Sequence, residues 1–123
     1  MTKQSWFKTF GVLLALTLVI SVVACSSSGG GVIELKASGL AFDKSTIRVS
    51  AGAQVTINFT NSDQIQHNFA LYTDSTASTP IFIGGFIGPG KTTYTFTAPS
   101  TPGTYFFRCN THPTTMTGSF VVS

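Results

Sequence analysis

The chain has 123 residues, of which only 9% are charged, and its formal net charge is +3 at pH 7. Two of its seven basic residues precede an apolar N-terminal segment, and from residue 32 onward five Lys and Arg stand against four Asp and Glu. This near-neutral remainder contains no basic stretch, which excludes a protein that binds nucleic acid by charge.

The first 24 residues have the layout of a secretory signal. A basic start precedes residues 10–23, which are almost unbroken apolar sequence but short for a membrane span. The end of this run, Val22-Val23-Ala24-Cys25, resembles the lipobox of bacterial lipoproteins. That resemblance implies cleavage of a signal peptide, 1–24, before Cys25, and a diacylglycerol on the Cys25 thiol. An uncleaved N-terminal anchor helix is the alternative, and both place the following domain outside the cytoplasm.

A flexible tether follows the lipobox. Residues 26–31 read Ser-Ser-Ser-Gly-Gly-Gly, so 25–31 is interpreted as the lipidated cysteine with its tether and 32–123 as one domain. The chain has two cysteines, and the lipobox takes Cys25. Cys109 is then an unpaired thiol in an oxidising compartment, where metal ligation is its most economical role.

From residue 32 the chain reads as a series of short strands. Apolar and polar residues alternate with a period of two, and no sustained helical period appears. Turn-forming pairs such as Ala51-Gly52 and Pro102-Gly103 separate the strands. We therefore expect an all-β fold, a Greek-key β-sandwich of seven or eight antiparallel strands. The residues expected to face inward are Ile33, Leu35, Ala37, Ile47, Val49, Val55, Ile57, Phe59, Phe69, Leu71, Ile81, Ile83, Tyr94, Phe96, Tyr105, Phe107, Phe120 and Val122.

Four potential metal donors lie in this domain: His67, Cys109, His112 and Met116. Two imidazoles and a thiolate in a trigonal array, with a weak axial thioether, form the donor set of a blue copper site. The sulfur donors favour Cu(I), while the imidazoles also accommodate Cu(II), so electron transfer needs little rearrangement. Three of the donors share one loop, Cys109-Asn-Thr-His112-Pro-Thr-Thr-Met116, between the last two expected strands.

Each donor also has an ordinary structural alternative when it is taken alone. Cys109 at the end of an apolar strand is a candidate core residue, and Met116 a gap-filler. His67 is a candidate turn cap, and His112-Pro113 a turn pair. A single copper ion, by contrast, uses every donor in the domain.

The segments around these donors resemble the cupredoxins, small blue copper proteins such as plastocyanin, amicyanin and pseudoazurin. Residues 103–109, Gly-Thr-Tyr-Phe-Phe-Arg-Cys, look like the strand that leads into the copper cysteine of the family. His67-Asn68 matches its first histidine and the following asparagine, and 49–59 resembles the strand pair before that histidine. The resemblance extends over nearly all of 32–123.

This resemblance implies a cupredoxin-type sandwich with one type 1 copper ion held by His67, Cys109, His112 and Met116. The chain departs from the family pattern in the length of the ligand loop. Three residues separate His112 from Met116, whereas plastocyanin-like loops commonly have four and amicyanin-like loops two. The departure leaves the strength of the axial bond open.

The resemblance also implies roles for residues around the metal. The backbone N–H groups of Asn68 and of a residue near His112 are expected to donate toward the Cys109 sulfur, which tunes the reduction potential. The Asn68 side chain is expected to pin the two ligand loops together, with turn capping as its alternative. His112 is expected to show its ring edge at the surface, with Pro113 and 85–89 forming either an apolar docking rim or an ordinary loop.

The function that follows is one-electron transfer at the outer face of a bacterial membrane, by a monomer that is not an enzyme. Its expected partners are redox proteins such as a cytochrome or a membrane oxidoreductase, and the membrane itself through the lipid anchor. Copper storage or delivery is the alternative, although the chain lacks the extra Met or His clusters that delivery proteins often carry. A copper enzyme needs further histidines, and zinc in a His₂Cys site leaves the methionine unexplained.

Overall fold

The computed structural model describes residues 30–123, so the predicted signal peptide, Cys25 and most of the predicted tether lie outside the described residues. The described part contains strands and no helix, which confirms the all-β prediction. No helix of this part is therefore long and apolar enough to cross a membrane. The strands are β1 (Val32–Ser38), β2 (Ala41–Phe42), β3 (Thr46–Val49), β4 (Gln54–Asn61), β5 (Ala70–Tyr72), β6 (Pro80–Ile83), β7 (Gly90–Thr97), β8 (Gly103–Arg108) and β9 (Thr117–Val122).

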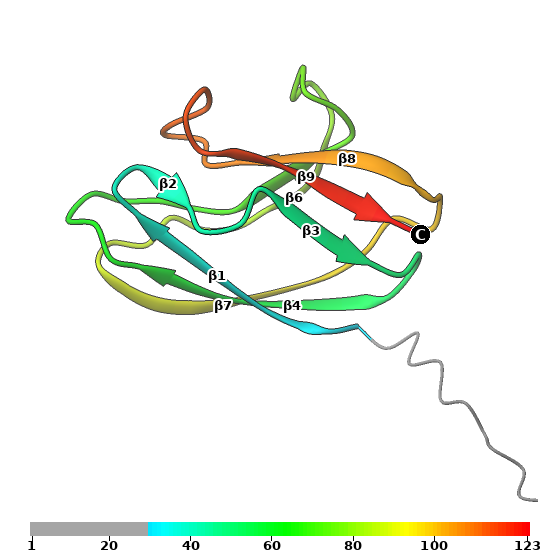
Figure 1. Ribbon diagram of the computed structural model, residues 1–123, viewed down its shortest axis with the longest axis horizontal. Coiled ribbons are helices and arrows are strands. Elements are labelled where there is room, and N and C mark those ends of the chain that lie inside the picture. Colours follow the sequence, from blue (N-terminus) through cyan, green and yellow to red (C-terminus); the bar gives the residue numbers. More distant parts are fainter. Residues whose placement is uncertain (1–29) are drawn as a thin grey trace, which may run out of the picture.

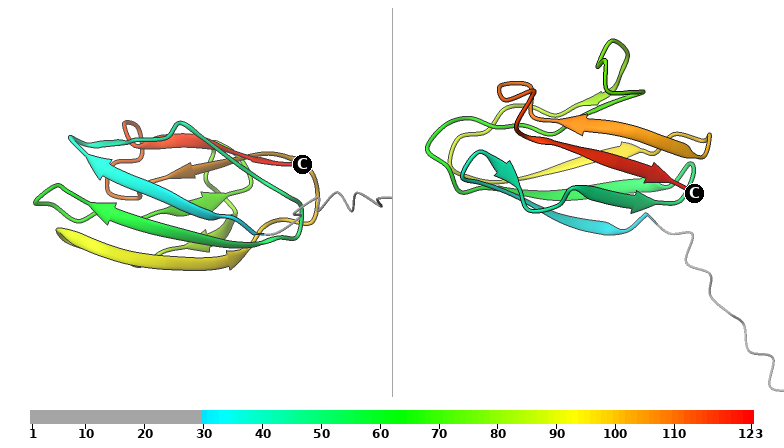
Figure 2. Two further views of the ribbon diagram at one scale, coloured as in Figure 1. Left: turned by 60° about the horizontal axis from the view of Figure 1, so that its bottom comes forward. Right: turned by 45° about the horizontal axis from the view of Figure 1, so that its top comes forward.

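The strands form two sheets packed face to face (Figures 1 and 2). One sheet has the order β2-β1-β4-β7 and the other the order β3-β9-β8-β5-β6. The sandwich is confirmed, but β1 runs parallel to β4 and β3 parallel to β9, so the expectation of antiparallel strands alone is wrong. Alternation of side chains reports the face that a residue occupies and carries no information on strand direction. Here the chain changes sheet at β3 and returns at β4, and that crossing produces the parallel pairs.

The strand count is nine in the described residues, against the expected seven or eight. The short strand β2 has two residues, too few to show a period. One expected inward residue is also wrong: Ile83 is 48% exposed at the end of edge strand β6. Phe82 faces the core in its place and stacks on Phe96 with ring centroids 4.7 Å apart. The pairing of β5 with β6 shifts register beside Leu71, which breaks the simple alternation.

A cluster of aromatic rings fills the space between the sheets. Phe69 and Phe107 are fully buried, and their ring centroids lie 5.4 Å apart. Burial of each such side chain stabilises the fold by about 1.5–3 kcal/mol. Since Phe69 follows His67 by two residues and Phe107 precedes Cys109 by two, this contact fixes the two segments that carry the predicted donors.

Candidate metal centre

The predicted donors gather at one end of the sandwich. Cys109 directly follows β8, and His112 and Met116 lie in the loop that leads to β9. His67 lies between β4 and β5 and forms an isolated antiparallel bridge with Ile87. In Figure 1 this is the left end, opposite the C-terminus, where β4 and β8 end and β7 and β9 begin; the views of Figure 2 agree.

Backbone hydrogen bonds hold the ligand loop in a compact shape. The Cys109 N–H donates to the Met116 carbonyl at 2.9 Å, and the Met116 N–H donates to the His112 carbonyl at 3.0 Å. The His112 N–H in turn donates to the Cys109 carbonyl at 3.2 Å. These three bonds close the loop, so the backbones of Cys109, His112 and Met116 lie close together in space.

The donor atoms converge on a single point. One donor atom from each of His67, Cys109 and His112 lies within 4.8 Å of the others. The Cys109 Sγ is 3.6 Å from the His67 Nδ1 and 3.9 Å from the His112 Nδ1. Bonds of about 2.3 Å to sulfur and about 2.0 Å to nitrogen, the lengths of zinc sites, put these donors about 3.7 Å apart at a trigonal angle. The three side chains thus have the separations that one metal ion requires.

The fourth predicted donor, Met116, is fully buried. Its carbonyl accepts the Cys109 N–H, which brings the backbones of the two residues together. Two imidazoles, a thiol and a thioether match the type 1 copper pattern, in which sulfur donors suit Cu(I) and imidazoles suit both oxidation states. The axial role of Met116 on its three-residue spacing stays a prediction.

His67 is buried and held at both ring nitrogens. Its Nδ1 faces the thiol, while its Nε2 donates to the Asp63 Oδ2 at 2.9 Å. Asp63 also accepts the backbone N–H groups of Leu40 at 3.0 Å and Gly39 at 2.7 Å. These two bonds, followed by the one from His67, lower the pKa of Asp63 to about 2. Sequence reasoning missed Asp63; the signal available was a carboxylate in a polar turn four residues before a histidine.

Asn68 links the two ligand segments. Its backbone N–H points to the Cys109 Sγ at 3.5 Å. Its side-chain Oδ1 accepts the Asn110 N–H at 2.9 Å, and its Nδ2 donates to the Gly84 carbonyl at 2.9 Å. The residue is fully buried, and the side chain holds three loops together.

The expected second backbone donor to the thiol, from a residue near His112, is not found: among the described residues the Asn68 N–H is the backbone group that points to the Cys109 Sγ, and the His112 N–H donates to the Cys109 carbonyl. The Thr111 hydroxyl lies 3.0 Å from the Cys109 Sγ and 3.0 Å from the His112 Nδ1. It also donates to the Gln66 carbonyl at 3.1 Å. Since its single proton goes to the Gln66 carbonyl, the Thr111 hydroxyl contacts the Cys109 sulfur without being a second donor to it, and nothing in the residue pattern had singled out Thr111.

Three of the four donors are fully buried, and only His112 reaches the surface. The His112 ring meets the His67 ring edge to face with centroids 4.9 Å apart. At the same end of the sandwich Pro113 is exposed, and Phe86 and Ile65 are 46% and 45% exposed. Apolar side chains thus lie at the end of the sandwich that carries the donors.

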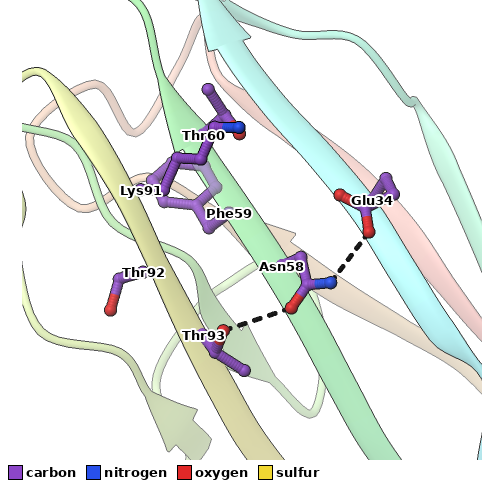
Figure 3. Close-up of a pocket in the computed structure, with 7 residues that line it drawn as sticks. All are labelled: Glu34, Asn58, Phe59, Thr60, Lys91, Thr92 and Thr93. Carbon is purple, nitrogen blue, oxygen red and sulfur yellow. Dashed lines mark hydrogen bonds between the residues drawn. The ribbon is translucent and has the colours of Figure 1, made fainter.

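A separate groove of about 410 Å³ lies on the outer face of the sheet formed by β1, β4 and β7 (Figure 3). Its polar side chains bond one another: the Asn58 Nδ2 donates to the Glu34 Oε1 at 2.8 Å, and the Thr93 hydroxyl donates to the Asn58 Oδ1 at 3.1 Å. The groove contains no histidine or cysteine. The metal centre and this groove are therefore unrelated.

Comparison with known proteins agrees with the donor geometry. The family of the cupredoxin-like domain matches residues 11–122 of the chain, a range that begins inside the predicted signal segment. No curated protein sequence matches the chain.

Solved structures with this fold include blue copper proteins. Auracyanin A, a "blue" copper protein from the green thermophilic photosynthetic bacterium Chloroflexus aurantiacus, is 32% identical, with a TM-score of 0.68 over 77% of this chain and 100% of its own. Dithionite-reduced auracyanin from Roseiflexus castenholzii is 28% identical, with a TM-score of 0.66 over 77% and 99% of the two chains. A reduced Cu(I) amicyanin variant, 22% identical, has a TM-score of 0.57 over 77% and 85%, a likeness of fold alone.

Proposed function

Because the chain belongs to the family of cupredoxin-like domains, we propose that it is a type 1 copper protein that carries single electrons between other redox proteins. One observation supports this function above the others: the buried Cys109 sulfur lies 3.6 and 3.9 Å from nitrogens of two histidines. The 32% identity to auracyanin A, a blue copper protein, supports the choice of metal.

Each residue of the centre has a distinct task in this proposal. His67, Cys109 and His112 would hold the ion, and Met116 would be a fourth, weaker donor. The bound ion supplies the Cu(I)/Cu(II) couple. Burial of three donors excludes water, and the Asn68 N–H stabilises negative charge on the sulfur. Because backbone bonds already close the ligand loop, little rearrangement accompanies a change of oxidation state.

Electrons enter and leave at the half-buried His112, the one donor that reaches the surface. Exposed Pro113 and Phe86 form an apolar rim on which a cytochrome or a membrane oxidoreductase docks. Transient redox partners use small interfaces, which suits a rim of this size. The domain acts as a monomer and catalyses no reaction of its own.

The domain, residues 32–123, operates outside the cytoplasm on a lipid anchor at Cys25. The strand β1 begins at the end of the sandwich where the chain terminates, away from the donors (Figure 1). Its seven residues extend about 23 Å. An anchor joined there leaves the metal end facing away from the membrane and free to meet partners.

The test is a copper titration of a soluble protein comprising residues 32–123, followed by visible spectroscopy and voltammetry. We expect one equivalent of Cu(II) to give an intense thiolate-to-copper absorption and a reversible one-electron wave. A colourless Cu(II) complex would refute the type 1 site. Colour without exchange of electrons with any small redox protein would favour copper storage or delivery.

A further inference from the structure

Asp63 connects the buried ligand His67 to a surface turn. Its Oδ2 accepts the His67 Nε2–H at 2.9 Å and the Leu40 N–H at 3.0 Å, while its Oδ1 accepts the Gly39 N–H at 2.7 Å. The Asp63 N–H donates to the Asn61 Oδ1 at 2.9 Å. The carboxylate therefore has no freedom to turn away from the histidine without losing these bonds.

We propose that Asp63 is a positioning and charge-donating residue for the copper ligand His67, an inference that rests on the proposed copper function. A metal-bound histidine commonly gives its second ring N–H to a carboxylate, which fixes the tautomer and makes the other nitrogen a stronger donor. Here the proton on Nε2 leaves Nδ1 as the free lone pair, and Nδ1 is the atom that faces Cys109.

The turn that holds Asp63 has an unusual backbone. Gly39 and Leu40 both have φ of +62°, as a two-residue hairpin turn of the primed type requires. Leucine is uncommon at such a value and persists there only when its surroundings hold it. Both N–H groups of this turn point to the Asp63 carboxylate. The turn between β1 and β2 is thus built to hold a charge against His67.

The charge of Asp63 is directed at the metal centre. Among the described residues, the ion pairs are the exposed one between Lys44 and Asp43 and the contact of Asp63 with His67. No Lys or Arg in that part of the chain therefore neutralises Asp63. Its side chain is 18% exposed, so water screens the charge only in part. A negative charge hydrogen-bonded to the His67 ring stabilises Cu(II) relative to Cu(I) and lowers the reduction potential.

The test compares Asp63→Asn with Asp43→Asn. Asp43 is the matched control, because its Oδ1 accepts the Lys36 N–H at 2.8 Å beside the same hairpin and makes no contact with a ligand. Loss of such a partner typically weakens metal binding about 10–100-fold. We expect Asp63→Asn to lose about 10-fold more affinity for Cu(II) than for Cu(I), which corresponds to a rise in potential of about 59 mV for one electron. Asp43→Asn should leave the potential unchanged.

A potential that stays at the wild-type value in Asp63→Asn, or that rises equally in Asp43→Asn, would overturn the proposal. A second readout needs no copper: nuclear magnetic resonance of the metal-free protein should show His67 protonated on Nε2 with a slowly exchanging proton. That proton should exchange faster in Asp63→Ala, and Asp63→Glu should restore slow exchange. If the wild type forms no coloured copper complex, the proposed function fails, but the exchange of the His67 Nε2 proton still tests whether Asp63 positions His67. Rapid exchange of that proton in the wild type would overturn this role of Asp63.

Discussion

Replacement of Asn68 by alanine tests how the two ligand segments are held together. The Asn68 side chain makes two hydrogen bonds, one from the Asn110 N–H and one to the Gly84 carbonyl, and the residue is fully buried. The variant keeps the backbone N–H that points to the Cys109 sulfur, so it removes only the side-chain link.

The expected loss follows from burial. Asn68→Ala leaves the Asn110 N–H and the Gly84 carbonyl without these partners. An unsatisfied buried polar group costs about 1–3 kcal/mol, so loss of the buried bond to Gly84 lowers the free energy of unfolding by about that amount. Loss of the partly buried bond from Asn110 adds less, because water can replace part of it. A domain of this size has a total stability of about 5–15 kcal/mol, so the variant remains foldable but is much weakened.

Asn58→Ala is the matched control. Asn58 also makes two side-chain hydrogen bonds, with Glu34 and Thr93, but on the outer face of the sheet (Figure 3). Water replaces these partners, so we expect a loss within about 0.5 kcal/mol. Urea unfolding of both metal-free variants, followed by circular dichroism, measures the difference. Equal losses would show that the Asn68 side chain is no special link and would refute the reasoning.

Substitutions at four further positions test the site, the fold and the anchor. Cys109→Ser should abolish the visible absorption of the copper form and leave the circular dichroism of the sandwich unchanged; persistence of the colour would exclude Cys109 as the thiolate. Met116→Leu should raise the potential in voltammetry and Met116→Gln should lower it, because an amide oxygen favours Cu(II); an unshifted potential in both would mean that Met116 is not a ligand. Burial, with the Cys109 thiolate second, raises the pKa of Tyr94 from 10.0 to about 12, so stability is full below pH 10 and falls as the pH rises from there toward 12. Tyr94→Phe should make that fall shallower in urea unfolding at each pH, and an equally steep fall would contradict the assignment. Cys25→Ser should abolish lipid labelling and block signal removal, and unchanged lipid incorporation would refute the anchor.

The alternation of residues predicted the sandwich because burial repeats every second residue along a strand. It predicted Leu35, Phe59 and Phe107 as core residues, and all three are buried. The same signal fails where a strand is very short, as in β2, or where the register of a pair shifts, as between β5 and β6 at Leu71 and Tyr72. Direction and order of strands depend on contacts between distant segments, which no local pattern contains.

The convergence of His67, Cys109 and His112 could be predicted from the sequence because few residue types bind soft metals, and each occurs rarely in this domain. The residues that hold the donors were less readable. Asp63 and Thr111 act through hydrogen bonds whose partners are set by the fold: Asp63 meets a turn 23 residues upstream of it at Leu40. Asp and Thr are common in turns, so the residue type alone does not show which of them contacts a metal donor. That becomes visible only when the positions of the loops in the fold are known.

The donors differ in how firmly the surrounding residues hold them. His67 is fixed by Asp63, and the Cys109 sulfur by the Asn68 N–H, neither of which depends on a metal. The His112 ring is half-buried, and its hydrogen-bonding contacts in the described residues are with the Thr111 hydroxyl and the Cys109 sulfur. His112 is therefore the donor that the surrounding residues hold least. Under the proposed function, this least constrained donor would lie on the side where a partner docks, because it is the one donor that reaches the surface, while His67 and Cys109 are fully buried.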